Sequence, residues 1–83
     1  MTQEQQATFT RVQTILQRQL GEDVKIEPTT DLLTDLGMES LEQVELGLQL
    51  EKEFATKLPI AELRSCVTVE EIVDLLLQKA SVK

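Results

Sequence analysis

The stretch DLGMESLEQVELGLQLEKEF, residues 35–54, decides the fold of this chain. A glycine-containing turn runs into a glutamate-rich helical pattern that we expect to span about residues 40–54. At 100° per residue its apolar side chains fall on two nearly opposite sides, Leu46, Leu50 and Phe54 on one and Leu41, Val44 and Leu48 on the other. We expect the first side in the core and the second as a partly exposed docking stripe, because so short a chain has little to cover a helix all round. The alternative is a central helix that is buried on both sides.

A second helix is expected to precede this stretch, over about residues 3–20. Apolar residues recur there at helical spacing. Thr2 and Gln5 have the spacing of a capping box at its start, and Gly21 predicts its end.

Two further helices are expected after it. Pro59 suits the first turn of a short helix over about residues 60–64. Thr68 and Glu71 have the spacing of another capping box and predict the start of the last helix.

The remaining connection, residues 22–39, is long and carries apolar residues among its polar ones. We expect it to be an ordered crossover with a short helical turn near residues 31–35, because those apolar residues can attach it to the core. No alternating strand pattern is present. The prediction is therefore an all-α, four-helix bundle with a long loop between helices one and two and a short third helix, forming a single domain over residues 1–83.

The composition limits the possible functions. Fifteen acidic and eight basic residues give a formal charge of −7, which argues against nucleic acid as a partner and favours basic protein surfaces. The chain has no histidine and one cysteine, so Cys-His nucleophiles and the common zinc sites are absent. No apolar run approaches the ~18 residues of a membrane span. We expect a soluble, cytoplasmic, monomeric protein that is not an enzyme.

Ser40 stands where the turn meets the helix and has three interpretations. As an N-cap it would accept a backbone N–H bond and form a capping box with Gln43, which is the interpretation that local sequence favours. A serine nucleophile is disfavoured, because there is no histidine and no Gly-x-Ser-x-Gly pattern. An attachment point is the third interpretation, since the free N–H groups of a helix N-terminus suit a phosphodiester.

The sequence GMESLEQVEL at residues 37–46, followed by LEKEF, LP and TVEEIVDLL, resembles the acyl carrier protein family over nearly the whole chain. In that family a serine opens the second of four helices and receives 4'-phosphopantetheine from coenzyme A. Ser40 matches this serine, and Leu41 matches the leucine that follows it. The resemblance implies a covalent arm on Ser40 whose thiol bears growing acyl or polyketide chains as thioesters, in fatty-acid, polyketide or other secondary-metabolite biosynthesis.

The resemblance also implies the partners. These are a phosphopantetheinyl transferase and acyl-transferring and chain-extending enzymes with basic docking surfaces. The residues expected to bind them surround Ser40 and follow the docking stripe: Glu39, Leu41, Glu42, Val44, Glu45, Leu48 and Glu51.

The chain departs from the family pattern at several positions. Glu39 stands where the family usually has aspartate, Lys52 interrupts the acidic surface of the second helix, and Ile60, Ala61 and Arg64 make the third element less acidic. These differences indicate a specialised carrier with its own set of partners. Two alternatives stay open: a peptidyl or D-alanyl carrier, and a helical interaction module without a prosthetic group.

Two other features of the sequence do not indicate a functional site. Asp31, Asp35 and Glu42 partly match an EF-hand loop, but Leu33 occupies a ligand position, so we expect no metal site. Cys66 is expected to be a buried small hydrophobe rather than a reactive thiol.

Overall fold

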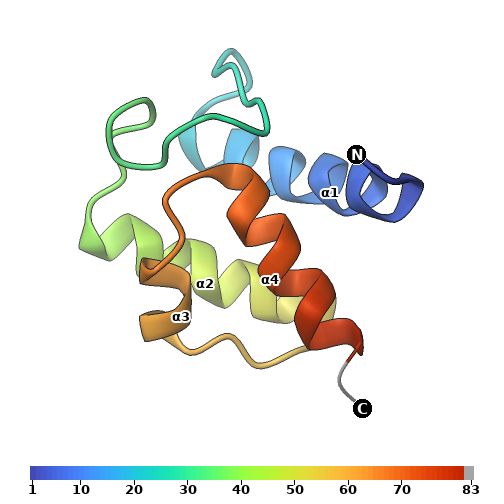
Figure 1. Cartoon of the computed structure of the whole chain (residues 1–83). Helices are drawn as coiled ribbons and strands as arrows, with labels where there is room; N and C mark the ends of the chain where they lie inside the picture. The colour runs from blue at the N-terminus through green and yellow to red at the C-terminus, as the bar shows by residue number, and fades with distance from the viewer. Residues whose placement is uncertain (82–83) are drawn as a thin grey trace.

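The computed structural model describes residues 1–81, and within them the chain forms four helices. They are α1 (Gln3–Leu20), α2 (Ser40–Phe54), α3 (Ile60–Arg64) and α4 (Val69–Ser81). In Figure 1, α4 starts beneath the long loop that joins α1 to α2, and the short α3 lies beside α2. The predicted all-α fold with a long first loop and a short third helix is confirmed. No helix in the described range is long and apolar enough to cross a membrane.

The start of α1 follows the predicted capping box. The Thr2 hydroxyl accepts the backbone N–H of Gln5 at 3.1 Å, and the Thr2 N–H donates to the Gln5 side chain at 2.8 Å. Two donors that would otherwise lack partners are thereby satisfied. The helix ends at Gly21, whose φ of 130° is in a region that favours glycine.

The core is aliphatic and lies between α1, α2 and α4. Its fully buried side chains come from every helix and from the loop ahead of α2: Val12, Leu16, Met38, Leu46, Leu50, Leu63, Val69, Ile72 and Val73. One side of α2 is in this core, as the spacing predicts. Each such side chain contributes about 1.5–3 kcal/mol by leaving water.

The opposite side of α2 is open. Leu41, Val44 and Leu48 are 71%, 38% and 62% exposed. The predicted docking stripe is therefore on the surface, and the alternative of a helix buried on both sides is wrong.

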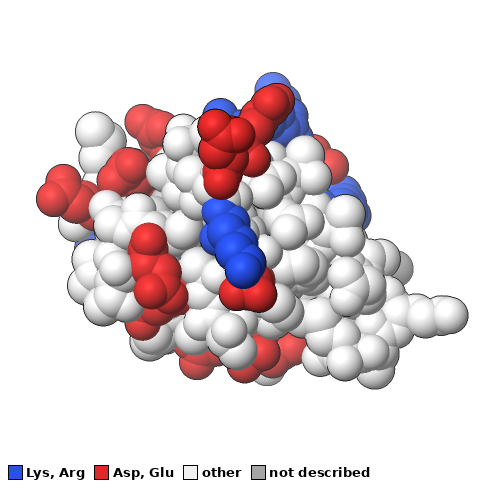
Figure 2. Space-filling model, turned by 90° about the horizontal axis from the view of Figure 1, so that it is seen from above, with Lys and Arg blue, Asp and Glu red and all other residues white. Residues whose placement is uncertain are grey.

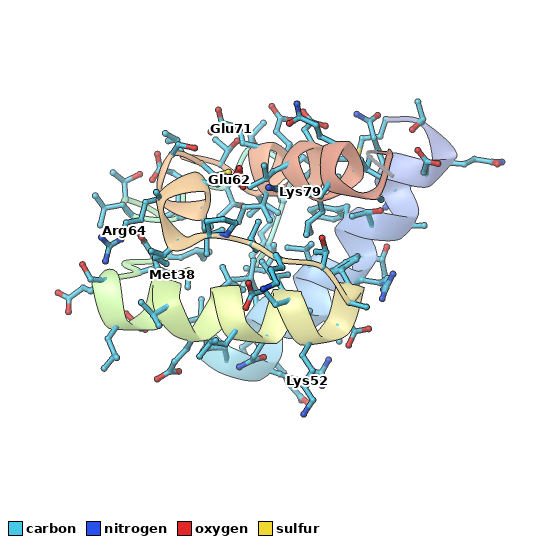
Figure 3. All side chains as sticks on the ribbon, turned by 90° about the horizontal axis from the view of Figure 1, so that it is seen from below. Met38, Lys52, Glu62, Arg64, Glu71 and Lys79 are labelled. Carbon is cyan, nitrogen blue, oxygen red and sulfur yellow. The ribbon has the colours of Figure 1, made fainter. Side chains whose placement is uncertain are left out.

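Helices α2 and α3 approach each other closely at Gly47. A Cβ atom placed on this glycine would lie 3.3 Å from Cδ2 of Leu63, so a larger residue would push against α3. The other end of the α3 contact is an ion pair in which the ammonium of Lys79 donates to Oε1 of Glu62 at 2.9 Å (Figure 3). The short α3 is thus held from both α2 and α4.

The long loop is attached by backbone hydrogen bonds to the junction between α3 and α4. The Leu32 N–H donates to the Val67 carbonyl at 2.9 Å, and the Val69 N–H donates to the Thr30 carbonyl at 3.1 Å. The expectation of an ordered crossover is confirmed. The helical turn expected near residues 31–35 is confirmed, since the Asp35 N–H donates to the Asp31 carbonyl four residues earlier at 3.1 Å. Asp31 also forms an isolated bridge with Thr68.

The start of α4 has only half of its predicted capping box. Glu71 accepts the backbone N–H of Thr68 at 3.0 Å and also that of Val67. The Thr68 hydroxyl oxygen is buried and has no hydrogen-bond partner in the part of the chain that the structure describes. Glu71 therefore holds the residues just before α4, while the N–H groups of Val69 and Glu70 at its start donate to backbone carbonyls of the long loop.

Candidate functional site

Ser40 is the first residue of α2 and is exposed. Its hydroxyl makes no hydrogen bond with any residue between 1 and 81, so the capping box that the sequence predicts between Ser40 and Gln43 is wrong. The N-cap is Glu39, whose backbone N–H donates to Oε1 of Glu42 at 3.1 Å. Because glutamate at both positions supplies the cap, the hydroxyl of Ser40 is left free.

The turn before α2 is fixed by Asp31. Its Oδ1 accepts the backbone N–H groups of Leu33 and Thr34 at 2.9 and 2.8 Å. The hydrogen bond from Thr34, and then that from Leu33, lower the pKa of the Asp31 carboxyl, although burial opposes them. This carboxylate organises the loop, and the residues between 1 and 81 contain no cluster of ligating side chains that could hold a metal ion.

Two residues join that turn to the helix. Gly37 has a φ of 63°, a conformation that costs glycine little. Met38 is fully buried, and its N–H donates to the Leu32 carbonyl at 3.0 Å. With Met38 anchored in the core, the next two residues must emerge at the surface.

A hollow of about 610 Å³ lies beside Ser40, open to solvent. Its lining is half apolar, from Leu33, Met38 and Leu41. The polar half includes Gln43, whose side-chain amide points to the Met38 carbonyl at 3.5 Å. Leu33 is 62% exposed. The sequence interpretation did not include this residue in the site, because two adjacent leucines in the sequence do not show which of them is buried.

The acidic residues expected to bind partners have different local roles. Glu45 is exposed and makes no interaction within the described range. Glu42 is engaged in the N-cap, and Glu51 accepts the backbone N–H of Leu58 at 2.7 Å. The structure thus leaves Glu45 with a freely available carboxylate, whereas those of Glu42 and Glu51 also stabilise the fold and that of Glu39 belongs to the capping box of α2.

The charge around the site is negative. Figure 2 shows carboxylates spread over the face that carries the long loop, with several basic side chains between them. No lysine or arginine lines the hollow beside Ser40. Lys52 lies near the far end of α2, where Figure 3 shows it pointing away from the bundle, and Arg64 lies at the end of α3.

The group that most often activates a serine hydroxyl, an imidazole, is absent from this site. The chain contains no histidine, so no imidazole is available as a base. Cys66 is half-buried, and burial, with the nearby charges of Glu71 and Glu62, raises the pKa of its thiol to about 11. A neutral thiol of this kind is a poor nucleophile, which agrees with a structural role for Cys66.

The surroundings of Ser40 fit a phosphodiester. The oxygen is accessible, its modification would break no hydrogen bond of the fold, and the N-terminus of a fifteen-residue helix provides N–H groups and the positive end of a dipole. The hollow alongside, with the apolar side chains of Leu33, Met38 and Leu41 in its lining, offers contact area to a flexible chain.

Comparison with known proteins agrees with this geometry. The model of the family described as "Phosphopantetheine attachment site" matches residues 10–76, which include Ser40 and part or all of every helix. The chain is also 37% identical over 75 residues to a protein named "Acyl carrier protein" from Cyanidioschyzon merolae (strain NIES-3377 / 10D). That match covers 89% of this chain and 82% of the relative.

Proposed function

The chain belongs to the phosphopantetheine-attachment family and is an acyl carrier protein, and from this premise we propose that Ser40 bears the 4'-phosphopantetheine arm. Proteins of this family hold the arm covalently, and its terminal thiol carries acyl groups as thioesters. The observation that carries the proposal is the free, exposed hydroxyl at the N-terminus of α2, where the cap is made by Glu39 and Glu42 instead.

Attachment requires another protein. Coenzyme A supplies the arm: the bond from Ser40 Oγ to phosphorus forms, the pyrophosphate bond breaks, and adenosine 3',5'-bisphosphate leaves. The proton of the hydroxyl needs a base, which a phosphopantetheinyl transferase must provide, because no imidazole is present in this chain. Carriers of this family interact with such transferases and with biosynthetic enzymes.

We propose that these partners bind the open stripe of α2. Leu41, Val44 and Leu48 supply exposed apolar contacts, and Glu45 supplies a carboxylate that is not engaged elsewhere in residues 1–81. A partner with an apolar groove edged by lysine and arginine would match this surface. Glu39, Glu42 and Glu51 add negative charge to the same side.

The proposed cargo is an acyl or polyketide chain in fatty-acid, polyketide or other secondary-metabolite biosynthesis. Its support is a hollow of about 250 Å³ between α2 and the start of α3, bordered by Val44, Leu48, Leu58 and Ile60. Glu39, Lys52 and Arg64 depart from the usual family pattern and favour a specialised carrier. We further propose that residues 1–83 act as one monomeric carrier domain; residues 82–83 lie outside the described residues.

The test is an intact-mass measurement after incubation with coenzyme A and a broad-specificity phosphopantetheinyl transferase. The parent should gain one phosphopantetheine, and Ser40→Ala should gain none. Ser65→Ala is the matched control, because the Ser65 hydroxyl donates to the Glu62 carbonyl at 2.6 Å and should not be modified.

Other outcomes would change the assignment. Modification of Ser40→Ala would place the arm on another residue. No gain with several transferases, on a protein shown to be folded, would favour the helical interaction module. Faster loading of an aminoacyl group than of a fatty-acyl group would favour the peptidyl or D-alanyl carrier.

A further inference from the structure

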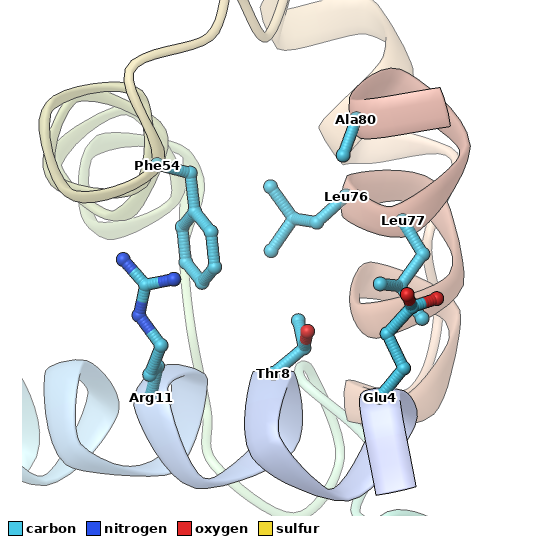
Figure 4. A pocket seen from close by; sticks show the side chains of 7 residues that line it. All are labelled: Glu4, Thr8, Arg11, Phe54, Leu76, Leu77 and Ala80. Carbon is cyan, nitrogen blue, oxygen red and sulfur yellow. The ribbon is translucent and has the colours of Figure 1, made fainter. Parts of the chain in front are cut away.

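A third cavity lies at the end of the bundle away from Ser40. It has a volume of about 380 Å³ and is bounded by α1, the last residue of α2 and the C-terminal half of α4 (Figure 4). Its apolar walls come from Phe54, Leu76, Leu77 and Ala80. The size falls within the range of about 300–1,000 Å³ that is typical of small-molecule sites.

One polar group points into this cavity from α1. Thr8 is only 8% exposed, and Figure 4 shows its side chain directed to the space between Phe54 and Leu76. Thr10 and Thr14, on the same helix, donate to carbonyl oxygens one turn earlier at 3.0 Å. The Thr8 hydroxyl has no such partner anywhere in residues 1–81, so it is free to hydrogen-bond with a ligand in the cavity that it lines.

The charges at the mouth are not balanced. The Arg11 guanidinium donates to the carbonyl and the carboxylate of Glu53 at 2.8 and 3.3 Å, and it lies 4.0 Å from the centre of the Phe54 ring. Its positive charge is therefore already paired. Glu4 also lines the cavity, and its carboxylate has no hydrogen bond or ion pair within the described part of the chain. The unpaired charge at this mouth is negative.

We propose that this cavity binds a small primary aliphatic amine in its ammonium form. The hydrocarbon chain would lie against Phe54, Leu76 and Leu77, and the ammonium group would donate to the Thr8 hydroxyl and the Glu4 carboxylate. An aliphatic carboxylate fits less well, because Arg11 is paired and the chain carries a net charge of −7. The proposal does not depend on the modification of Ser40.

The test compares three probes of equal length: n-hexylammonium, n-hexanol and n-hexanoate. Each is titrated at constant ionic strength into the full chain, and amide chemical shifts are followed by NMR. Hexylammonium should bind most tightly, with shifts concentrated at residues 4–11, 54 and 76–80. Glu4→Gln and Thr8→Val should each weaken it by about tenfold, the effect of losing one charge-assisted hydrogen bond.

Glu22→Gln is the matched control, because it removes the same charge from an exposed loop position that does not line the cavity. It should leave the affinity for hexylammonium unchanged. Equal affinity for all three probes, or shifts spread over the whole acidic surface, would overturn the proposal. So would an equal loss of affinity in Glu22→Gln and Glu4→Gln. Thermal unfolding of each variant without ligand shows whether a loss of binding reflects a loss of fold.

Discussion

The backbone N–H of Glu39 donates to the carboxylate of Glu42 at 3.1 Å, and this bond closes the start of α2 without the hydroxyl of Ser40. Glu39 and Glu42 thus form the cap of α2. The Ser40 hydroxyl has no part in the cap and is therefore free to be modified.

This arrangement separates modification from stability. Ser40→Ala should change the free energy of unfolding by no more than about 0.5 kcal/mol, because no hydrogen bond is lost. Glu42→Ala should cost about 1 kcal/mol, because it removes half of the cap and a favourable charge at the helix N-terminus. Urea denaturation followed by circular dichroism measures the change in the free energy of unfolding for both variants. Equal changes would show that Ser40 also caps α2.

The exposed stripe of α2 predicts opposite results for two neighbouring apolar positions. Val44→Glu should keep the helical circular dichroism spectrum and lower kcat/KM for a phosphopantetheinyl transferase by about tenfold, because the change falls on the open side. Leu46 is fully buried, so Leu46→Glu should unfold the domain. Loss of helicity in Val44→Glu would place this residue in the core.

Two glutamates on α2 should also differ. Glu45→Gln should slow association with the transferase and reduce its dependence on salt, with little change in stability, because this carboxylate has no partner within residues 1–81. Glu51→Ala should instead destabilise the fold by about 1 kcal/mol, because the Leu58 N–H loses its acceptor. Stopped-flow binding measures the association rate, and urea denaturation measures the free energy of unfolding. A destabilised Glu45→Gln would contradict the prediction that this carboxylate acts only in binding.

The thiol of Cys66 should react slowly in the folded protein. With a pKa raised to about 11, only about one thousandth of it is thiolate at about pH 8, so a disulfide reagent should label it far faster after unfolding. The folded state holds the thiol proton more tightly than the unfolded state does. The free energy of unfolding should therefore fall as the pH rises above the pKa of the thiol in the unfolded state, about 8.5–9. Cys66→Ala removes this titration and is the control. A fast-reacting Cys66 in the folded chain would refute the burial of the thiol.

The helices could be predicted from sequence because local signals agreed with one another. The spacing of apolar residues, the Thr2 and Gln5 pair, and Gly21 all defined α1 at its observed ends. The two sides of α2 could be distinguished for a simpler reason: in so short a chain the other three helices and the loop cannot enclose α2 on every side.

The cap of α2 and the role of Glu51 could not be predicted in the same way. Serine is a preferred N-cap residue, and only the three-dimensional course of the turn shows that Glu39 has the position. Glu51 resembles any surface glutamate in sequence, while its bond to Leu58 depends on how the chain folds back after α2. The loop is attached at Thr30 and Leu32 through backbone groups. Because every residue has these groups, the sequence does not indicate where such hydrogen bonds form.

That loop attachment has a consequence for the timing of modification during synthesis. The setting of Ser40 depends on backbone hydrogen bonds between residues 28–32 and residues 67–70, and the latter are synthesised only after α2 and α3. A growing polypeptide can extend well past Ser40 and still lack the segment that fixes the turn before it. Chains released early should therefore present a poorly organised serine, so that the transferase discriminates against unfinished polypeptides.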